Sequence, residues 1–257
     1  MLTPLLLGLL ALPFGASGSA SGLQSYSGQA VDLRRAQPLY DEQHFVRTLD
    51  GQPTERMVVY RCNDGSAFAR KQVDYGSDPF APSFELVDAR LDYREGLRRS
   101  GTGLVTFAGS GAGAREAAIE GASSLVADSG FDRFVQAHWQ RLQAGDTVEI
   151  DFLVPSRGEA LSFRLRKQES LQLEGVAASR IRLSLSGFLS LFAPNIDVIY
   201  RDSDQWLLRF EGLTNIRESV GRNLVARIDF PRTPETAPEE AWAAAAAEPL
   251  VDCQLRG

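Results

Sequence analysis

The sequence predicts a mainly β protein, built as a curved antiparallel sheet or incomplete barrel that packs on one principal α-helix at about residues 130–143. Three observations predict this fold class. Apolar and polar residues alternate with a period of two in several segments, the turn signals between these segments are short, and one segment shows helical spacing of apolar residues. Strands joined by short turns favour an antiparallel meander over βαβ units.

The predicted strands come one after another along the chain. Between residues 87 and 94, Val87, Leu91 and Tyr93 alternate with charged residues, as on a strand with one buried face. The same alternation recurs at residues 161–166, 180–185, 206–211 and 224–230. Turn signals lie at residues 63–65, 156–158, 202–204 and 220–222.

The predicted helix has a wide apolar face. Asp128 or Ser129 can cap its start, and Gly145 can end it. The residues at helical spacing are Phe131, Phe134, Val135, His138, Trp139 and Leu142. A helix with such an aromatic face needs a large surface to pack on, and we expect that surface to be the concave face of the sheet.

The start of the chain predicts export. Residues 2–14 form a short apolar run, and Gly18 and Ala20 fit the −3 and −1 positions of a signal-peptide cleavage site. The run is shorter than the ~20 residues that usually span a membrane, so we expect no stable transmembrane segment after cleavage. The predicted organisation is a signal peptide at 1–20, a flexible lead-in at 21–40, a β-rich domain at 41–231 and a Pro/Ala-rich C-terminal tail at 232–257, in a bacterial periplasmic or secreted protein.

Two cysteines, Cys62 and Cys253, are present. In an oxidising compartment they can form one disulfide that ties the C-terminal tail to the body, and the alternative is two buried free thiols. The formal net charge of −6 argues against a nucleic-acid partner, because phosphate binding needs a basic surface.

A glycine-rich segment at residues 109–114 has the spacing of a dinucleotide-binding fingerprint. The chain lacks the alternating βαβ pattern that this motif requires, so the sequence favours a flexible loop there and predicts no cofactor.

Catalytic and metal-binding signatures are sparse. The chain has two histidines, His44 and His138, and no His or Cys pair has metal-ligand spacing, so no metal site is predicted. A triad of Ser156, His138 and Asp128 can be written, but Ser156 lacks a nucleophile-elbow setting. Glu149 and Asp151 share one strand face, as many surface carboxylates do. No catalytic residue is therefore assigned.

Arginines recur on neighbouring predicted strands, at Arg157, Arg164, Arg166, Arg180 and Arg182. If these strands pair, one sheet face carries a basic stripe that could bind carboxylate or phosphate groups. The alternative is an exposed face that Glu159, Glu169 and Glu174 neutralise.

Three segments, at residues 127–135, 152–157 and 210–216, resemble a group of uncharacterised exported bacterial proteins that are rich in β structure. The resemblance runs from about residue 58 to residue 230, and it implies no activity for any residue. The architecture is also similar to that of periplasmic β-proteins whose curved sheet wraps a helix, some of which carry lipids.

The sequence favours a non-enzymatic periplasmic binding or accessory protein that holds an apolar or lipid-like ligand between sheet and helix. The predicted ligand-binding residues are Phe134, Val135, His138, Trp139, Arg157, Arg164 and Arg182. Two alternatives are a hydrolase that acts on envelope material through carboxylates and a structural partner that docks by a sheet edge. Protein partners, ligand identity and oligomeric state are not readable from the sequence.

Overall fold

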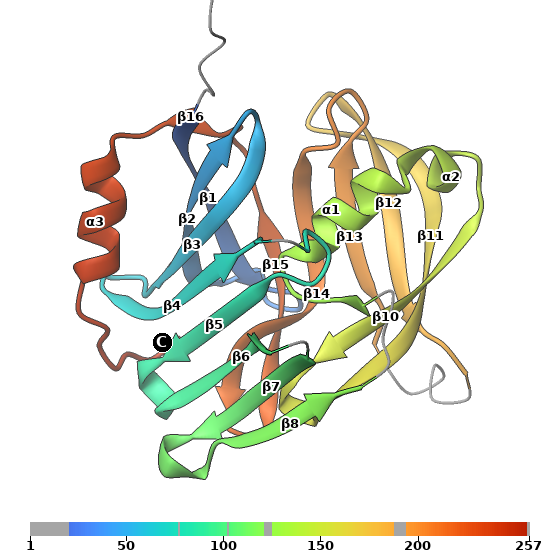
Figure 1. The fold of residues 1–257 in the computed structure, drawn as a ribbon. Helices are drawn as coiled ribbons and strands as arrows, with labels where there is room; N and C mark the ends of the chain where they lie inside the picture. The colour runs from blue at the N-terminus through green and yellow to red at the C-terminus, as the bar shows by residue number, and fades with distance from the viewer. Residues whose placement is uncertain (1–20, 77, 102, 121–124, 188–193, 256–257) are drawn as a thin grey trace, which may run out of the picture.

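The computed structural model describes residues 21–76, 78–101, 103–120, 125–187 and 194–255, so the predicted signal peptide lies outside the described residues. These residues form one 16-stranded sheet that does not close, because β8 and β9 are its two edges (Figure 1). The first arm runs in chain order and comprises β1 (Ser21–Asp32), β2 (Pro38–Leu49), β3 (Gln52–Arg61), β4 (Ala67–Asp74), β5 (Ser83–Asp88), β6 (Tyr93–Ser100), β7 (Gly103–Ser110) and β8 (Arg115–Ile119).

The second arm also runs in chain order. It comprises β9 (Leu125–Val126), β10 (Thr147–Val154), β11 (Glu159–Leu173), β12 (Val176–Leu185), β13 (Ile196–Arg201), β14 (Leu207–Ser219) and β15 (Arg222–Asp229). The two arms join where β1 pairs with β15, and the short β16 (Glu235–Thr236) adds to β1. All of these pairings are antiparallel except β9 with β10, which is parallel. The predicted fold class is confirmed.

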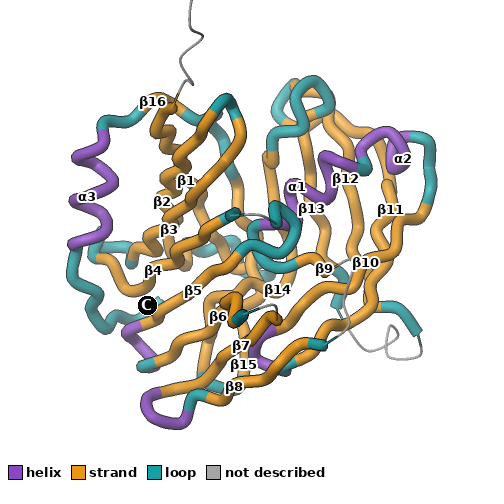
Figure 2. Tube along the Cα trace, viewed as in Figure 1, coloured by secondary structure: helices purple, strands orange, loops and turns teal. Residues whose placement is uncertain are grey.

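Two short helices, α1 (Gly130–Ala137) and α2 (Trp139–Gln143), lie across the inner side of the second arm (Figures 1 and 2). The sequence predicted one helix here. His138 interrupts it, because its ring Nδ1 lies 2.9 Å from the Phe134 carbonyl oxygen, which its own backbone N–H also uses. Such side-chain bonds compete with the regular helical ladder.

The predicted flexible lead-in at residues 21–40 is wrong. Residues 21–32 form β1, a central strand in which Leu23 and Ala30 are buried. Its small residues reflect close packing rather than disorder. At Gly28, an added Cβ atom would lie 2.4 Å from the Phe230 ring, so the strand needs glycine there.

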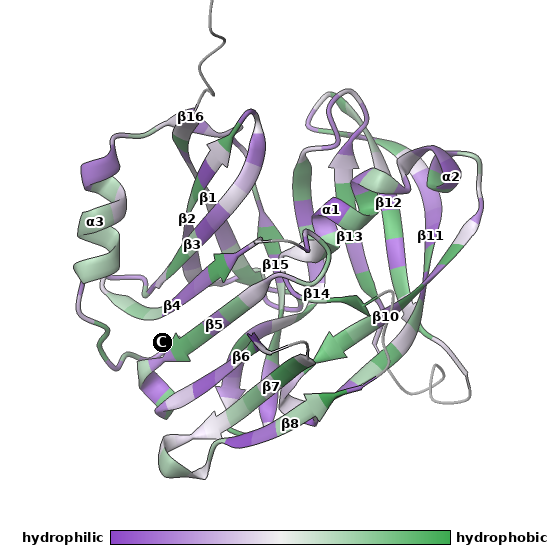
Figure 3. Ribbon diagram, in the orientation of Figure 1, coloured by the Kyte–Doolittle hydropathy of each residue, from purple (hydrophilic) through white to green (hydrophobic). Residues whose placement is uncertain are grey.

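The C-terminal segment packs on the outer face of the first arm, opposite to the inner face that points towards the second arm. Helix α3 (Glu239–Ala247) places Ala245 in a cluster with Phe45, Met57 and Val59, which alternate with inward-facing residues on β2 and β3. Figure 3 shows that hydrophobic and hydrophilic residues are interspersed along the strands of both arms. The predicted disulfide is confirmed: Cys62 and Cys253 are bonded, 191 residues apart in sequence.

The glycine-rich segment at residues 109–114 connects two antiparallel strands, β7 and β8, through the 3₁₀ turn η2 (Gly111–Gly113). A Cβ atom at Gly109 would lie 2.6 Å from the Ala114 Cα atom, so this glycine permits a tight turn. The segment therefore lacks the strand-to-helix setting of a dinucleotide-binding loop.

Candidate functional site

The predicted apolar site residues lie in a filled core. Phe134, Val135 and Trp139 are buried against strands β10 to β13, and the Trp139 ring meets Tyr200 edge to face at 6.2 Å between ring centroids. His138 is half-buried and stacks on Phe134. Two cavities lie nearby, a cleft between α1 and strands β1 to β3 and a cavity on the outer face of strands β3 to β8. None of these four residues lines either of them. Their role in ligand binding stays a prediction.

The predicted arginine stripe lies on the other face of β11 and β12, and two of its three predicted binding residues are paired. Arg182 makes two 2.7 Å hydrogen bonds to Asp197 of β13. Arg157, in the 3₁₀ turn η3 (Pro155–Arg157), pairs with Glu159 at 2.7 Å, while Arg164 is exposed. The acidic partners thus compensate much of the stripe. Anion binding at these arginines stays a prediction.

Asp128 and His138 have partners of their own in the structure. The Asp128 carboxylate accepts a 2.7 Å hydrogen bond from Lys71 Nζ and another from Ser129 Oγ. His138 bonds the Phe134 carbonyl oxygen. Among the residues that the structure describes, no hydrogen bond links Ser156, His138 and Asp128 into a triad.

A cleft of about 190 Å³ lies on the other side of α1, between this helix and strands β1 to β3. Helix α1 therefore separates the filled core from an open space. The apolar and aromatic residues that line the cleft are Tyr26, Val46, Pro53, Tyr200, Trp206, Leu207, Phe230 and Pro234. Its polar lining residues are Gln24, Thr48, Arg56, Asp132, Arg133, Gln136 and Gln205.

Arg56 of β3 is the least satisfied charged group in the wall of the cleft. Its side chain is 15% exposed, and its Nε atom is buried with no hydrogen-bond partner. Its nearest carboxylate, Asp132 of α1, lies 3.9 Å from Nη1, beyond hydrogen-bond distance, and accepts a 2.7 Å hydrogen bond from the Tyr200 hydroxyl. Burial alone would lower the pKa of Arg56, but Tyr26, Tyr75 and the nearby carboxylates raise it overall, so the guanidinium stays charged.

Buried polar residues continue from the cleft into the first arm. The Tyr26 ring stacks on His44 at 4.4 Å between centroids, and His44 Nε2 lies 2.8 Å from a Glu42 carboxylate oxygen. Burial lowers the pKa of His44 despite this carboxylate, so the imidazole is neutral at pH 7 and donates its Nε2 proton to Glu42. His44 Nε2 therefore has a hydrogen-bond partner within the chain, whereas Arg56 Nε has none.

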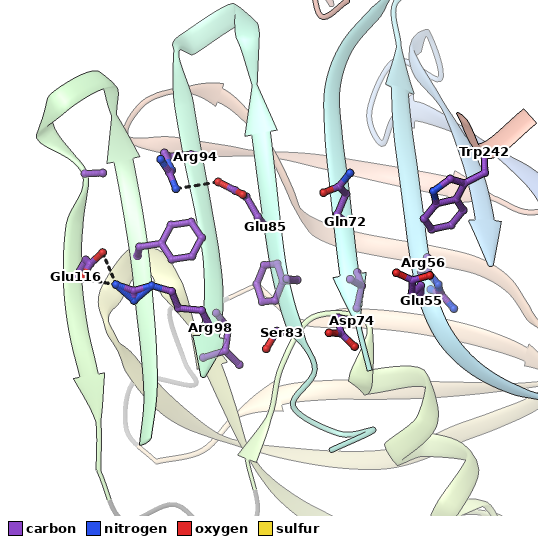
Figure 4. Close-up of a pocket in the computed structure, with 15 residues that line it drawn as sticks. Glu55, Arg56, Gln72, Asp74, Ser83, Glu85, Arg94, Arg98, Glu116 and Trp242 are labelled. Atoms are coloured by element: carbon purple, nitrogen blue, oxygen red, sulfur yellow. Dashed lines mark hydrogen bonds and ion pairs between the residues drawn. The ribbon is translucent and has the colours of Figure 1, made fainter. Parts of the chain in front are cut away.

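A second cavity of about 530 Å³ lies on the outer face of the first arm, from β3 to β8, with Trp242 of α3 at one end (Figure 4). Arg56 of the cleft wall lines this cavity too. The other two lining arginines are paired with neighbouring carboxylates, Arg94 with Glu85 at 2.9 Å and Arg98 with Glu116 at 2.7 Å. These side chains are about half exposed, so each pair is worth little and is screened by water. The cleft beside α1 is therefore the stronger candidate site.

Sequence reasoning missed Arg56, although a signal for its position exists. Residues 57–60 form an apolar run, Met57-Val58-Val59-Tyr60, which indicates a strand buried on both faces. Arg56 shares a face with Val58 and Tyr60, because side chains two residues apart point the same way. A charged residue at such a position is a candidate for an inward-facing site.

The chain matches no family model and no curated protein. It is similar in fold to solved bacterial proteins. One is described as a β-barrel-like protein of the domain of unknown function DUF1849 from Brucella abortus, with 7% identity, a TM-score of 0.46, and coverage of 85% of this chain and 98% of that one. Another is a "putative outer membrane lipoprotein-sorting protein domain" from Vibrio parahaemolyticus, with 6% identity, a TM-score of 0.32, and coverage of 89% and 92%.

A third similar structure is a DUF1329 family protein from Desulfovibrio piger, with 10% identity, a TM-score of 0.31, and coverage of 91% of this chain and 93% of that one. At these identities and TM-scores, the likeness carries no argument about function. Among the described residues, no helix is long and apolar enough to cross a membrane.

Proposed function

We propose that this protein is a non-enzymatic periplasmic binding or accessory protein that holds a small amphiphile in the cleft beside α1. The observation that supports this function is the mixed lining of the cleft, in which eight aromatic and apolar residues lie beside seven polar ones, including the largely buried Arg56. Ligand sites in proteins have this composition, with apolar walls that bind and polar groups that orient. The disulfide between Cys62 and Cys253 agrees with an oxidising compartment outside the cytoplasm.

The cleft fits binding better than carboxylate catalysis. Asp132 is the one carboxylate among its lining residues, whereas a glycosidase-type reaction needs two that face each other. The volume of about 190 Å³ is below the usual range for drug-sized ligands, so we expect one end or one segment of an amphiphile to enter rather than the whole molecule.

The test uses dodecanol, a neutral alkyl probe, in a calorimetric titration of the folded protein. We expect saturable binding at one site. Gln136→Trp should weaken it at least about tenfold by filling the cleft from α1, a loss of ~1.4 kcal/mol or more. Gln140→Trp is the matched control, because Gln140 is exposed and lines neither cavity, and it should bind like the wild type. If neither dodecanol nor a charged amphiphile of the same chain length binds saturably to the wild-type protein, the proposal is refuted.

A further inference from the structure

We propose that the cleft beside α1 takes an anionic amphiphile and that Arg56 receives its charged oxygen atoms. This inference rests on the proposed function and names the chemical class of its ligand. The shared chemistry is a compact anionic head, either carboxylate or phosphate, on an apolar chain.

The charges of the cleft favour an anion. Its charged lining residues are Arg56, Arg133 and Asp132, so one positive charge is left without a negative partner in the cleft wall. Arg133 contacts only neutral amides, those of Gln52 and Gln136, in the hydrogen bonds that the structure gives it. A monoanionic head would balance the charge of the cleft.

The hydrogen bonding of Arg56 points to an external acceptor. Arg182, elsewhere in the same sheet, shows the satisfied state of a guanidinium in this protein, with two 2.7 Å hydrogen bonds to Asp197. Arg56 has only the 3.9 Å approach of Asp132, and its Nε atom has no partner. Native proteins rarely bury an unpaired charged donor, because its lost hydration is costly. A carboxylate or phosphate bound at the exposed part of the guanidinium would supply the close anionic partner that Asp132, at 3.9 Å, does not provide.

Asp132 does not supply this interaction because it is held elsewhere. The Tyr200 hydroxyl donates to one of its oxygens at 2.7 Å, and Tyr200 itself is fully buried. Asp132 therefore stays beside Arg56 without pairing closely with it. In this position the negative charge of Asp132 also repels a bound anion, so removal of that charge should strengthen anion binding.

The apolar lining can take the remainder of the ligand. Trp206, Leu207 and Phe230 line the same cleft as Arg56, so one molecule could contact both the charge and the apolar wall. A ligand with an anionic head alone would leave this wall in water, and an uncharged hydrocarbon would leave Arg56 unpaired.

The experiment compares four probes with the same chain: dodecanoate, dodecyl phosphate, dodecanol and dodecyltrimethylammonium. Dissociation constants are measured with the full mature chain, below the micellar concentration and at constant ionic strength. We expect the better of the two anions to bind about 10- to 100-fold more tightly than dodecanol, and the cation to bind most weakly. The comparison of dodecanoate with dodecyl phosphate distinguishes a carboxylate from a phosphate head.

Two variants test the role of each charge: one removes the positive charge of Arg56, and the other removes the negative charge of Asp132. Arg56→Met should abolish the preference for the anion and leave dodecanol binding intact, whereas Asp132→Asn should strengthen anion binding several-fold. Arg98→Met, on the outer face, is the matched control and should change neither affinity. The wild-type comparison needs no variant, so it remains decisive if Arg56→Met fails to fold.

The outcomes separate this inference from the proposed function. Equal binding of dodecanol and both anions by the wild type would overturn the anionic ligand while leaving amphiphile binding in place. An anion preference that survives in Arg56→Met would overturn the role of Arg56. Failure of all four probes to bind would overturn the proposed function itself.

Discussion

Charged side chains inside the sheet are the main feature at the scale of single residues. Lys71 and Asp128 pair at 2.7 Å with side chains only 11% and 10% exposed, and Arg217 meets Glu95 in the same interior. A buried ion pair adds little net stability when formed, but breaking it leaves one charge without compensation. These pairs therefore restrict which substitutions the inner face of the first arm accepts.

Replacement of Lys71 by Met should destabilise the protein by about 3–5 kcal/mol at pH 7, because Asp128 would remain charged and buried. The matched control is Arg98→Met at the exposed pair with Glu116, which should cost less than about 1 kcal/mol. Urea denaturation of both variants measures the difference. Similar losses in the two variants would show that the burial of the Lys71 pair has no energetic effect.

The pH dependence of the Lys71 pair follows from the pKa of Asp128. Burial raises this pKa, but Lys71 and the hydrogen bonds from Ser129 outweigh burial and hold it below the ordinary value. The pair therefore contributes stability above the ordinary carboxyl pKa of about 3.9 and loses it as the pH falls through the lower folded value. The deficit of Lys71→Met should thus be largest near neutral pH and shrink in acid, as denaturation at several pH values would show.

His44 should make the protein less stable in mild acid. Because burial lowers its folded pKa, the unfolded chain takes up a proton near pH 6.5 that the folded chain excludes. Stability should therefore fall as the pH drops from 7 to 5, and His44→Gln should flatten this slope. A nuclear magnetic resonance titration checks the cause directly, and a His44 pKa above 6.5 would contradict it.

At the scale of elements, the start of α1 is fixed by a close backbone contact. A Cβ atom on Gly130 would lie 1.9 Å from the Phe80 carbonyl oxygen, and Ala127 N donates to the same oxygen at 2.9 Å. Helix α1 is therefore held against the segment between β4 and β5. This contact fixes the distance between α1 and the first arm and thus helps to set the width of the cleft.

Gly130→Ala should cost about 1–3 kcal/mol, because the backbone of Phe80 or α1 must shift to admit one methyl group. Gly113→Ala is the matched control, since a Cβ atom added at Gly113 would meet nothing within 4 Å and its backbone is not left-handed. Thermal unfolding of the two variants provides the comparison. A stable Gly130→Ala variant would mean that α1 can move away from the first arm without loss.

The second arm was more predictable from the sequence than the first. Its strands alternate cleanly, so the segments at 161–166, 180–185 and 224–230 largely coincide with parts of β11, β12 and β15. The segment at 87–94, expected as one strand, is instead the end of β5, a 3₁₀ turn and the start of β6. Asp88 accepts hydrogen bonds from the backbone N–H and the guanidinium of Arg90, and this local capping reverses the chain. Alternation alone cannot reveal such a turn.

The candidate site was less predictable than the fold. The aromatic face of α1 was recognised, and it packs into a core as expected, but the cleft lies on the opposite face of the helix. Its wall combines residues from β1, β2, β3, α1, β13 and β14, which come together only through the β1–β15 pairing. A periodic pattern reports which face of one element is buried, and it carries no information about which distant elements meet.

At the scale of the whole molecule, the disulfide holds the C-terminal segment on the first arm. Mutation of Cys62 and Cys253 to Ser should cost about 2–5 kcal/mol, because the bond closes a loop across 191 residues. Hydrogen exchange should rise first in α3 and the residues that follow it, while β10 to β13 keep their protection. Equal exchange in the oxidised protein and the double variant would show that packing of α3 alone secures this segment.

The pairing of β1 with β15 also decides the order in which the protein can fold. Each arm can form step by step from strands adjacent in sequence, but the arms join only when Gln29 meets Asp229, near opposite ends of the described chain. Contacts of such long sequence separation are slow to form, because a long loop must close first. A chain that emerges from its amino end must therefore keep one edge of β1 unpaired until nearly all of the protein has appeared. During that interval β1 is the edge most open to pairing with another chain, and the last step of folding is also the step that removes this risk.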